Sequence, residues 1–204
     1  WPKSARGRIY AISDPAHVND PLIKETQKLI GGDWTKKTND ELAKLLAHAD
    51  WRVRLEAQYT LAERGAASMP VLARIATTAT PVGQVSDLTH LARRHAIWGL
   101  GQLAATNASA LAPLRTLVRD ADAEVRAQSI KVLGDHRARD QADALIAALK
   151  DKNARVKFFA AQSLGKLKHA GAAPALLAAL RANDDADNYL RHALVMGLVG
   201  CNNL

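Results

Sequence analysis

The chain has 204 residues, of which 48% are hydrophobic, 24% charged and 4% aromatic. This composition excludes a disordered protein, and the scarcity of aromatic residues argues against a β-sandwich and for packed helices. The formal charge of +8 raises nucleic acid as a partner, but adjacent basic residues occur only as Lys36-Lys37 and Arg93-Arg94. Phosphate binding needs cations clustered on one face, so this scattered charge argues against a nucleic-acid partner.

The first 37 residues differ in character from the rest of the chain. Residues 7–12 are predicted to be extended, because the proline of Ser13-Asp14-Pro15 disfavours helix before it. A helix is expected from Asp20-Pro21 until Gly31-Gly32, followed by a linker that ends at residue 37. No stretch of about 18 apolar residues occurs, so no membrane span is expected in this chain.

Residues 38–204 contain one small pattern five times. A residue of a helix-capping type is followed four positions later by a basic residue, at intervals of 31 to 39 residues. Intervals of this size indicate a helical repeat array. The repeats are predicted at residues 38–65, 66–106, 107–137, 138–169 and 170–204.

Each repeat is expected to be a pair of antiparallel helices. Thr38 and Glu41 form a predicted capping box before the first pair. In the second helix of a pair, a small residue lies three positions after the basic residue, a leucine seven positions after it and often a glycine at the eighth. This order of small and large residues predicts close packing between neighbouring helices.

The basic residues themselves are interpreted as structural. Each can reach the capping residue before it, or the equivalent residue of the next repeat, and so form a ladder of charge-assisted hydrogen bonds along the stack. The capping residues are expected to bind free N–H groups at the helix starts. The predicted ladder consists of Asp50 with Arg54, Thr89 with Arg93, Asp122 with Arg126, Asn153 with Lys157, and Asp187 with Arg191.

The second helices also provide a candidate interaction surface. Positions two and five residues after each basic residue are expected to be exposed and to form one continuous stripe. Aromatic residues such as Tyr59 and Trp98 could serve there as anchors for a partner. They could instead pack under the insertion at residues 78–87, or simply complete the hydrophobic layer. The stripe consists of Glu56, Tyr59, His95, Trp98, Gln128, Lys131, Phe159 and Gln162.

The repeats resemble a known family. Asp122-Ala123-Glu124-Val125-Arg126 followed by Leu133-Gly134 resembles the HEAT repeat of the short, bilin-lyase-like type, from residue 38 to the C-terminus. The signatures of tetratricopeptide and ankyrin repeats are absent. The resemblance implies an all-α, right-handed α-solenoid of about five HEAT-like hairpins, preceded by the short extended segment.

A narrower resemblance is carried by residues 7–15, 45–54 and 94–103. These segments are similar to the middle of membrane-bound dehydrogenases of planctomycete-type bacteria, in which a sugar-dehydrogenase-like propeller precedes HEAT repeats and a haem domain follows. The resemblance implies a periplasmic or cell-envelope location, and it implies haem and pyrroloquinoline quinone elsewhere in the parent protein. The haem motif Cys-x-x-Cys-His is absent from this chain, whose one cysteine is Cys201.

The sequence therefore predicts a non-catalytic scaffold for a protein or a neighbouring domain. We expect no catalytic residues, no cofactor and no metal site in this chain, because no His or Cys spacing fits a known ligand set. Two alternatives remain open at this stage. One is a nucleic-acid-binding solenoid similar to the DNA glycosylases built from HEAT repeats, and the other is a tetrapyrrole-binding protein similar to the bilin lyases.

Overall fold

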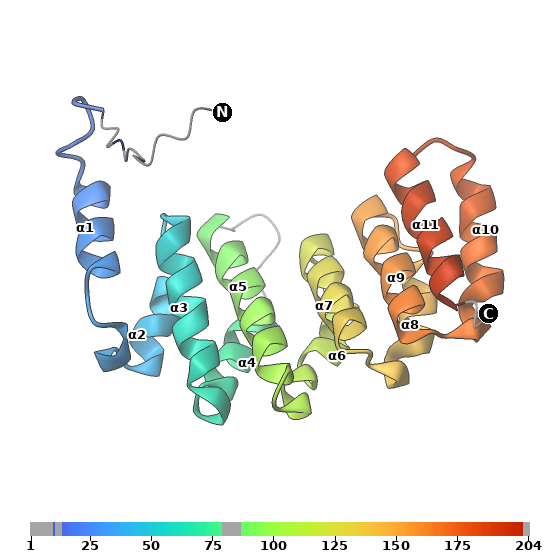
Figure 1. The fold of residues 1–204 in the computed structure, drawn as a ribbon, viewed down its shortest axis with the longest axis horizontal. Helices are drawn as coiled ribbons and strands as arrows, with labels where there is room; N and C mark the ends of the chain where they lie inside the picture. The colour runs from blue at the N-terminus through green and yellow to red at the C-terminus, as the bar shows by residue number, and fades with distance from the viewer. Residues whose placement is uncertain (1–9, 11–13, 79–86, 202–204) are drawn as a thin grey trace, which may run out of the picture.

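The computed structural model describes residues 10, 14–78 and 87–201 of the chain. The regular structure within these ranges consists of eleven α-helices and five short 3-10 helices, with no strand. The α-helices after the first form five hairpins that stack side by side along the longest axis of the molecule (Figure 1). The predicted all-α solenoid is confirmed.

Helix α1 (Pro21–Ile30) precedes the hairpins at one end of the stack (Figure 1). The Asp20 side chain accepts a hydrogen bond from the Leu22 N–H at 2.8 Å, and Pro21 fills the first helical position, where no donor is required. A 3-10 turn, Trp34–Lys36, occupies part of the predicted linker. The extended segment predicted at residues 7–12 lies outside the described residues apart from Tyr10, which has no regular structure.

We call the first helix of each hairpin an A helix and the second a B helix. The A helices are α2 (Asn39–Leu45), α4 (Met69–Thr77), α6 (Leu114–Leu117), α8 (Ala142–Ala148) and α10 (Ala173–Asn183). The B helices are α3 (Trp51–Glu63), α5 (Asp87–Ala104), α7 (Ala123–Asp135), α9 (Ala154–Leu167) and α11 (Asn188–Cys201). Each B helix contacts the next along the stack, so the five B helices form one continuous layer.

The A helix of the third hairpin is shorter than the sequence suggests. The spacing of Leu111, Leu114 and Leu117 predicts one helix, but the structure divides it into a 3-10 turn (Ala108–Leu111) and the single turn of α6. Pro113 lies between the two pieces and has no N–H to donate, so a continuous α-helical hydrogen-bond ladder is interrupted there. All three leucines are nevertheless buried.

The core follows the predicted alternation of small and large residues. The leucines seven positions after the first four basic residues are completely buried, and so are the small residues at the third position. The small side chains allow neighbouring B helices to approach, and the leucines fill the layer between the A and B helices. The leucines are Leu61, Leu100, Leu133 and Leu164; the small residues are Ala57, Ala96, Ser129 and Ala160.

Candidate functional site

Two of the repeated arginines join neighbouring hairpins. Arg126 on α7 donates to both carboxylate oxygens of Asp151 in the next hairpin, from Nε to Oδ2 at 2.8 Å and from Nη2 to Oδ1 at 2.9 Å. Arg93 on α5 donates to both oxygens of Asp120 at 3.2 and 2.6 Å. The hydrogen bonds of Asp151 to Arg126 and to the Asn153 N–H lower the pKa of this carboxyl, although burial alone would raise it. These bidentate contacts are charge-assisted and link the second hairpin to the third and the third to the fourth.

The acceptors in these contacts are not the capping residues. Asp120 and Asp151 lie two positions before the caps Asp122 and Asn153, and each also accepts the backbone N–H of the cap, at 2.9 and 2.8 Å. One carboxylate thus shapes the turn before a B helix and receives the guanidinium of the preceding hairpin. The sequence does hold a signal for this role, because an aspartate stands two positions before the caps of α7, α9 and α11.

Four of the five predicted capping residues accept a hydrogen bond from an N–H in the first turn of a B helix. These are Asp50, Asp122, Asn153 and Asp187. Thr89 does not stand at the start of a helix, because α5 begins at Asp87 and Thr89 falls within its first turn. The prediction that Thr89 precedes the helix is therefore wrong.

The remaining basic residues depart from the predicted ladder. Arg54 donates to the carbonyl oxygens of His48 and Ala49, both at 2.7 Å. Arg191 donates to Asp185 of its own hairpin at 3.0 Å. The Lys157 N–H donates to the Asn153 carbonyl oxygen at 3.2 Å within the helix, but its side chain makes no hydrogen bond or ion pair with the residues that the structure describes. The charge of Lys157 nevertheless helps to lower the pKa of Asp151. The ladder of bidentate contacts thus ends at α9.

The stripe predicted on the B helices is only partly exposed. Tyr59 and Glu56 on α3 are exposed, whereas Trp98, Lys131, Phe159 and Gln162 are half-buried. His95 and Gln128 are buried, with 7% and 4% of their surfaces accessible. The prediction of a uniformly exposed stripe is wrong at these two residues, because side chains of the adjoining B helices cover them.

His95 is held in a chain of polar contacts between α3 and α5. The Arg54 Nε donates to His95 Nε2 at 3.3 Å, and the other ring nitrogen, Nδ1, lies 2.7 Å from Gln58 Oε1. Gln58 in turn donates to Gln102 Oε1 at 3.1 Å. Since Nε2 accepts a hydrogen bond, the proton of the neutral ring is on Nδ1 and donates to Gln58. Burial, together with the charges of Arg54 and Arg94, lowers the pKa of His95 from 6.5 to about 4.

A second chain of contacts continues from α5 to α9. The Trp98 indole N–H donates to Gln128 Oε1 at 2.8 Å, and Gln128 donates to Glu124 Oε1 at 2.6 Å. Glu124 pairs with Arg155 at 2.9 Å, and the Arg155 guanidinium lies 5.0 Å from the centroid of the Phe159 ring. His95 and Trp98 join the two chains through an edge-on ring contact with centroids 5.0 Å apart. The predicted aromatic residues of α5 and α9 thus belong to one connected surface.

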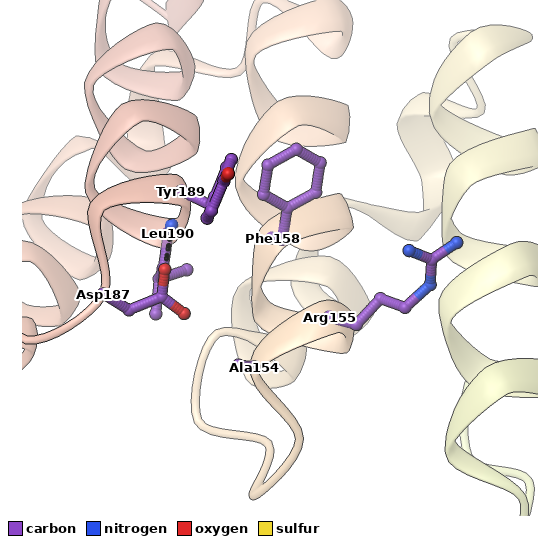
Figure 2. A pocket seen from close by; sticks show the side chains of 6 residues that line it. All are labelled: Ala154, Arg155, Phe158, Asp187, Tyr189 and Leu190. Atoms are coloured by element: carbon purple, nitrogen blue, oxygen red, sulfur yellow. Dashed lines mark hydrogen bonds between the residues drawn. The ribbon is translucent and has the colours of Figure 1, made fainter.

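A pocket of about 300 Å³ opens between the N-terminal ends of α9 and α11 (Figure 2). The side chains of Phe158 and Tyr189 face one another across it, while Arg155 extends away toward α7. Asp187 lies at the foot of the pocket and accepts the Leu190 N–H at 2.9 Å. Tyr189 is 82% exposed. Phe158 and Tyr189 were not among the predicted residues, because they lie one position after and two positions before the repeated basic residues and so fall outside the predicted stripe.

The charged side chains of the B helices are mostly paired with opposite charges. This arrangement places alternating charges on the surface instead of a single positive field. The pairs are Arg52 with Asp50 at 2.7 Å, Arg155 with Glu124 at 2.9 Å, and Lys131 and Lys166 with Asp135 at 2.7 and 2.5 Å.

Within residues 10, 14–78 and 87–201, no three His, Cys, Asp or Glu side chains are grouped so that they could hold a metal ion. In the same ranges, no helix combines the length and the apolar character needed to cross a membrane.

Comparisons with known proteins agree with this geometry. The family model for HEAT repeats matches residues 111–199, whereas no curated protein matches the chain. A designed armadillo repeat protein in complex with the peptide (KR)4 has a TM-score of 0.54 and 19% identity, over 92% of this chain and 97% of the designed one. The crystal structure of an engineered protein has a TM-score of 0.51 and 18% identity, over 79% of this chain and 78% of its own. The protein thus has an armadillo- and HEAT-like α-solenoid fold, and its residues 111–199 are similar to HEAT repeats.

Proposed function

We propose that this protein is a non-catalytic scaffold whose B-helix layer binds a segment of a partner protein or a neighbouring domain. The observation that carries the proposal is the connected surface from Arg54 to Phe159, in which buried polar side chains hold aromatic rings in fixed positions. Rings held in this way offer contact area at little cost in conformational entropy. The solenoid fold, typical of interaction scaffolds, supports the same conclusion.

The shape of the surface indicates how a partner segment would lie. The exposed ring of Tyr59 on α3 and the pocket between Phe158 and Tyr189 stand at opposite ends of the connected surface. An extended segment that crosses the B helices would meet Tyr59, then Trp98, and then the pocket. The designed armadillo repeat protein whose fold this chain shares is itself in complex with a peptide, (KR)4.

The proposal is tested by selecting peptides that bind the full chain from a random displayed library. Tyr59→Ala and Tyr189→Ala each remove an exposed ring, so neither is expected to disturb the fold. Loss of an aromatic anchor at an interface typically weakens binding about tenfold or more. Leu177→Ala is the matched control, because Leu177 is an exposed apolar residue on the A helix α10.

We expect selected peptides to bind the control like the wild type and to lose affinity for the tyrosine variants. A Trp98→Phe variant keeps a ring but loses the N–H that Gln128 accepts, so a smaller loss is expected there. Peptides that bind all the variants equally well would rule out the B-helix layer as the binding surface.

The fuller form of the proposal places the scaffold between a dehydrogenase propeller and a haem domain. This form rests on the resemblance carried by residues 7–15, 45–54 and 94–103. Sequencing the gene on both sides of this region tests it, with a propeller expected upstream and Cys-x-x-Cys-His downstream. Flanking sequence without either feature would leave only the scaffold.

A further inference from the structure

Two grooves lie between successive A helices, and each is lined in part by one cation of a B helix. The groove between α6 and α8 has a volume of about 200 Å³, and the Arg126–Asp151 ion pair lies on its wall. The groove between α8 and α10 is larger, at about 360 Å³, and has Lys157 in the position that corresponds to Arg126. The two grooves therefore differ in the cation that the B helix contributes, which is the paired Arg126 in the smaller groove and Lys157 in the larger one.

The carboxylate that the ladder predicts for the larger groove does not line it. The residue that corresponds to Asp120 and Asp151 is Asp185, which pairs with Arg191 and has a side chain that is 73% exposed. Asp185 and the preceding Asp184 have positive φ angles of 57° and 40°. Lys157 thus makes no direct ion pair of the kind that Arg93 and Arg126 make, and its charge acts on Asp151 only at longer range.

The charge in the larger groove is unbalanced as a result. Asp151 also lines it, but both of its carboxylate oxygens are bonded to Arg126. Lys150 and Lys157 line this groove together with side chains that are mainly apolar, among them Ile146, Leu149 and four alanines of α10. Such a groove is complementary to a carboxylate attached to an aliphatic body.

We propose that the α8–α10 groove binds an acidic side chain of a partner protein, together with an adjoining aliphatic residue. The carboxylate would bind Lys157 in the place where the ladder elsewhere has an aspartate, and the aliphatic side chain would pack on the alanines of α10. A protein segment is the occupant because the same contact is made within this chain by protein turns, namely those that carry Asp120 and Asp151. Lys157 belongs to the B helix α9, but no residue that lines this groove also lines the pocket between α9 and α11.

The probe for this site is a blocked peptide with the sequence of residues 117–122, Leu-Val-Arg-Asp-Ala-Asp, which is the turn that meets Arg93 in the folded chain. Its matched control has Asn in place of the residue that corresponds to Asp120. Binding to the isotope-labelled full chain is followed by NMR. We expect shifts at the amides of Lys150, Lys157, Ala178 and Ala182, and an affinity about fivefold higher for the Asp peptide, as fits one half-exposed charge pair.

Variants of the protein decide whether Lys157 is the cause of this preference. Lys157→Met keeps the apolar stem and should bind the two peptides equally, and Lys157→Gln serves the same purpose if the Met variant does not fold. Lys44→Met makes the same charge change at an exposed site on α2 and should keep the fivefold preference.

Three results would overturn the proposal. The first is an absence of shifts at the groove, and the second is equal affinity of the wild type for the Asp and Asn peptides. The third is a shift of the groove amides by hexanoate but by neither peptide, which would indicate a small-molecule site instead of a docking site for protein.

Discussion

Asp151 illustrates how one side chain can serve two hairpins. Its carboxylate accepts the Asn153 N–H, which fixes the turn before α9, and it also receives both donors from Arg126 on α7. Both side chains are largely buried, with 18% and 15% accessible for Arg126 and Asp151. An ion pair in this setting leaves an unpaired charge behind when one partner is removed.

Arg126→Ala is therefore expected to lower the free energy of unfolding by about 3 kcal/mol, measured by urea denaturation. Arg126→Lys should have an intermediate effect, because one ammonium cannot reproduce two parallel bonds. Arg155→Ala is the control, since its ion pair with Glu124 is more exposed, at 56% and 25%, and should contribute less than about 1 kcal/mol. Equal losses in Arg126→Ala and Arg155→Ala would contradict a bracing role for the ladder.

His95 makes the stability of the chain depend on pH. The folded state holds the pKa of His95 at about 4, below the unfolded value of 6.5, so the unfolded chain binds more protons between these values. The stabilisation is complete above pH 6.5 and decreases as the pH falls toward 4, by about 3 kcal/mol in total.

The measurement is the free energy of unfolding from pH 7 to pH 4 in the wild type and in His95→Gln. The wild type should lose about 3 kcal/mol more than the variant over this range. His192→Gln changes an exposed histidine and should follow the wild-type curve. Parallel curves for the wild type and His95→Gln would show that the ring is not held neutral.

Single residues also show why the ladder could be only partly predicted. Capping depends on contacts two or three positions apart, so the roles of Asp122 and Asn153 follow from local sequence. The aspartate two positions before the cap is visible in the sequence, as Asp151 is before Asn153. Its contact with Arg126, however, depends on how far α7 is displaced from the next turn, which the sequence of one repeat does not specify. The nearest acidic residue in the pattern, the cap, is therefore a misleading guide, and Asp151 was missed.

At the scale of helices, close approach of backbones limits the side chains at the junctions. A Cβ added at Gly134 on α7 would overlap the side chain of Ser163 on α9 and lie 2.8 Å from its Cα. A Cβ at the equivalent Gly101 on α5 would instead meet a methyl group of Val132 at 3.0 Å, which can move more easily than backbone. The glycine eight positions after the basic residue is therefore more strictly required between α7 and α9 than between α5 and α7.

Gly134→Ala should lower the free energy of unfolding by about 1 to 3 kcal/mol, because the overpacking outweighs the gain of about 1 kcal/mol in helix propensity. Gly101→Ala should be close to neutral, as measured by the same denaturation experiment. A Gly134→Ala variant as stable as Gly101→Ala would mean that α7 and α9 can separate without cost.

Helices were easier to predict than their ends or their exposed sides. The spacing of apolar residues along the B helices is long and regular, so their existence and their buried leucines follow from the sequence. The division of the A helix at Pro113 and the burial of His95 do not follow, because both depend on neighbouring elements. The pocket between Phe158 and Tyr189 also lies between two repeats, where the pattern of one repeat carries no information.

At the scale of the whole molecule, each hairpin contacts mainly its neighbours, so stability should vary along the stack. Leu133 lies on α7, which contacts both α5 and α9, whereas Leu194 lies on α11 in the last hairpin of the stack (Figure 1). Both leucines are completely buried. The position of a truncated leucine in the stack should therefore determine how many neighbouring hairpins lose stability.

Leu133→Ala and Leu194→Ala each remove similar apolar volume and should cost about 2 to 5 kcal/mol locally. By hydrogen exchange, Leu194→Ala should lower protection in α10 and α11 only, whereas Leu133→Ala should lower it on both sides of α7. Uniform loss of protection in both variants would indicate a single cooperative unit instead of a stack.

The two-sided use of carboxylate and arginine also bears on how such a chain can change its length. The third hairpin presents Asp120 to the hairpin before it and Arg126 to the hairpin after it. A duplicated copy of this hairpin inserted next to it would present an aspartate on one side and an arginine on the other. Every arginine of the ladder would then still have a carboxylate partner. The insertion or deletion of whole hairpins within the chain is therefore compatible with these ion pairs, whereas the insertion of part of a hairpin would break two of them at once.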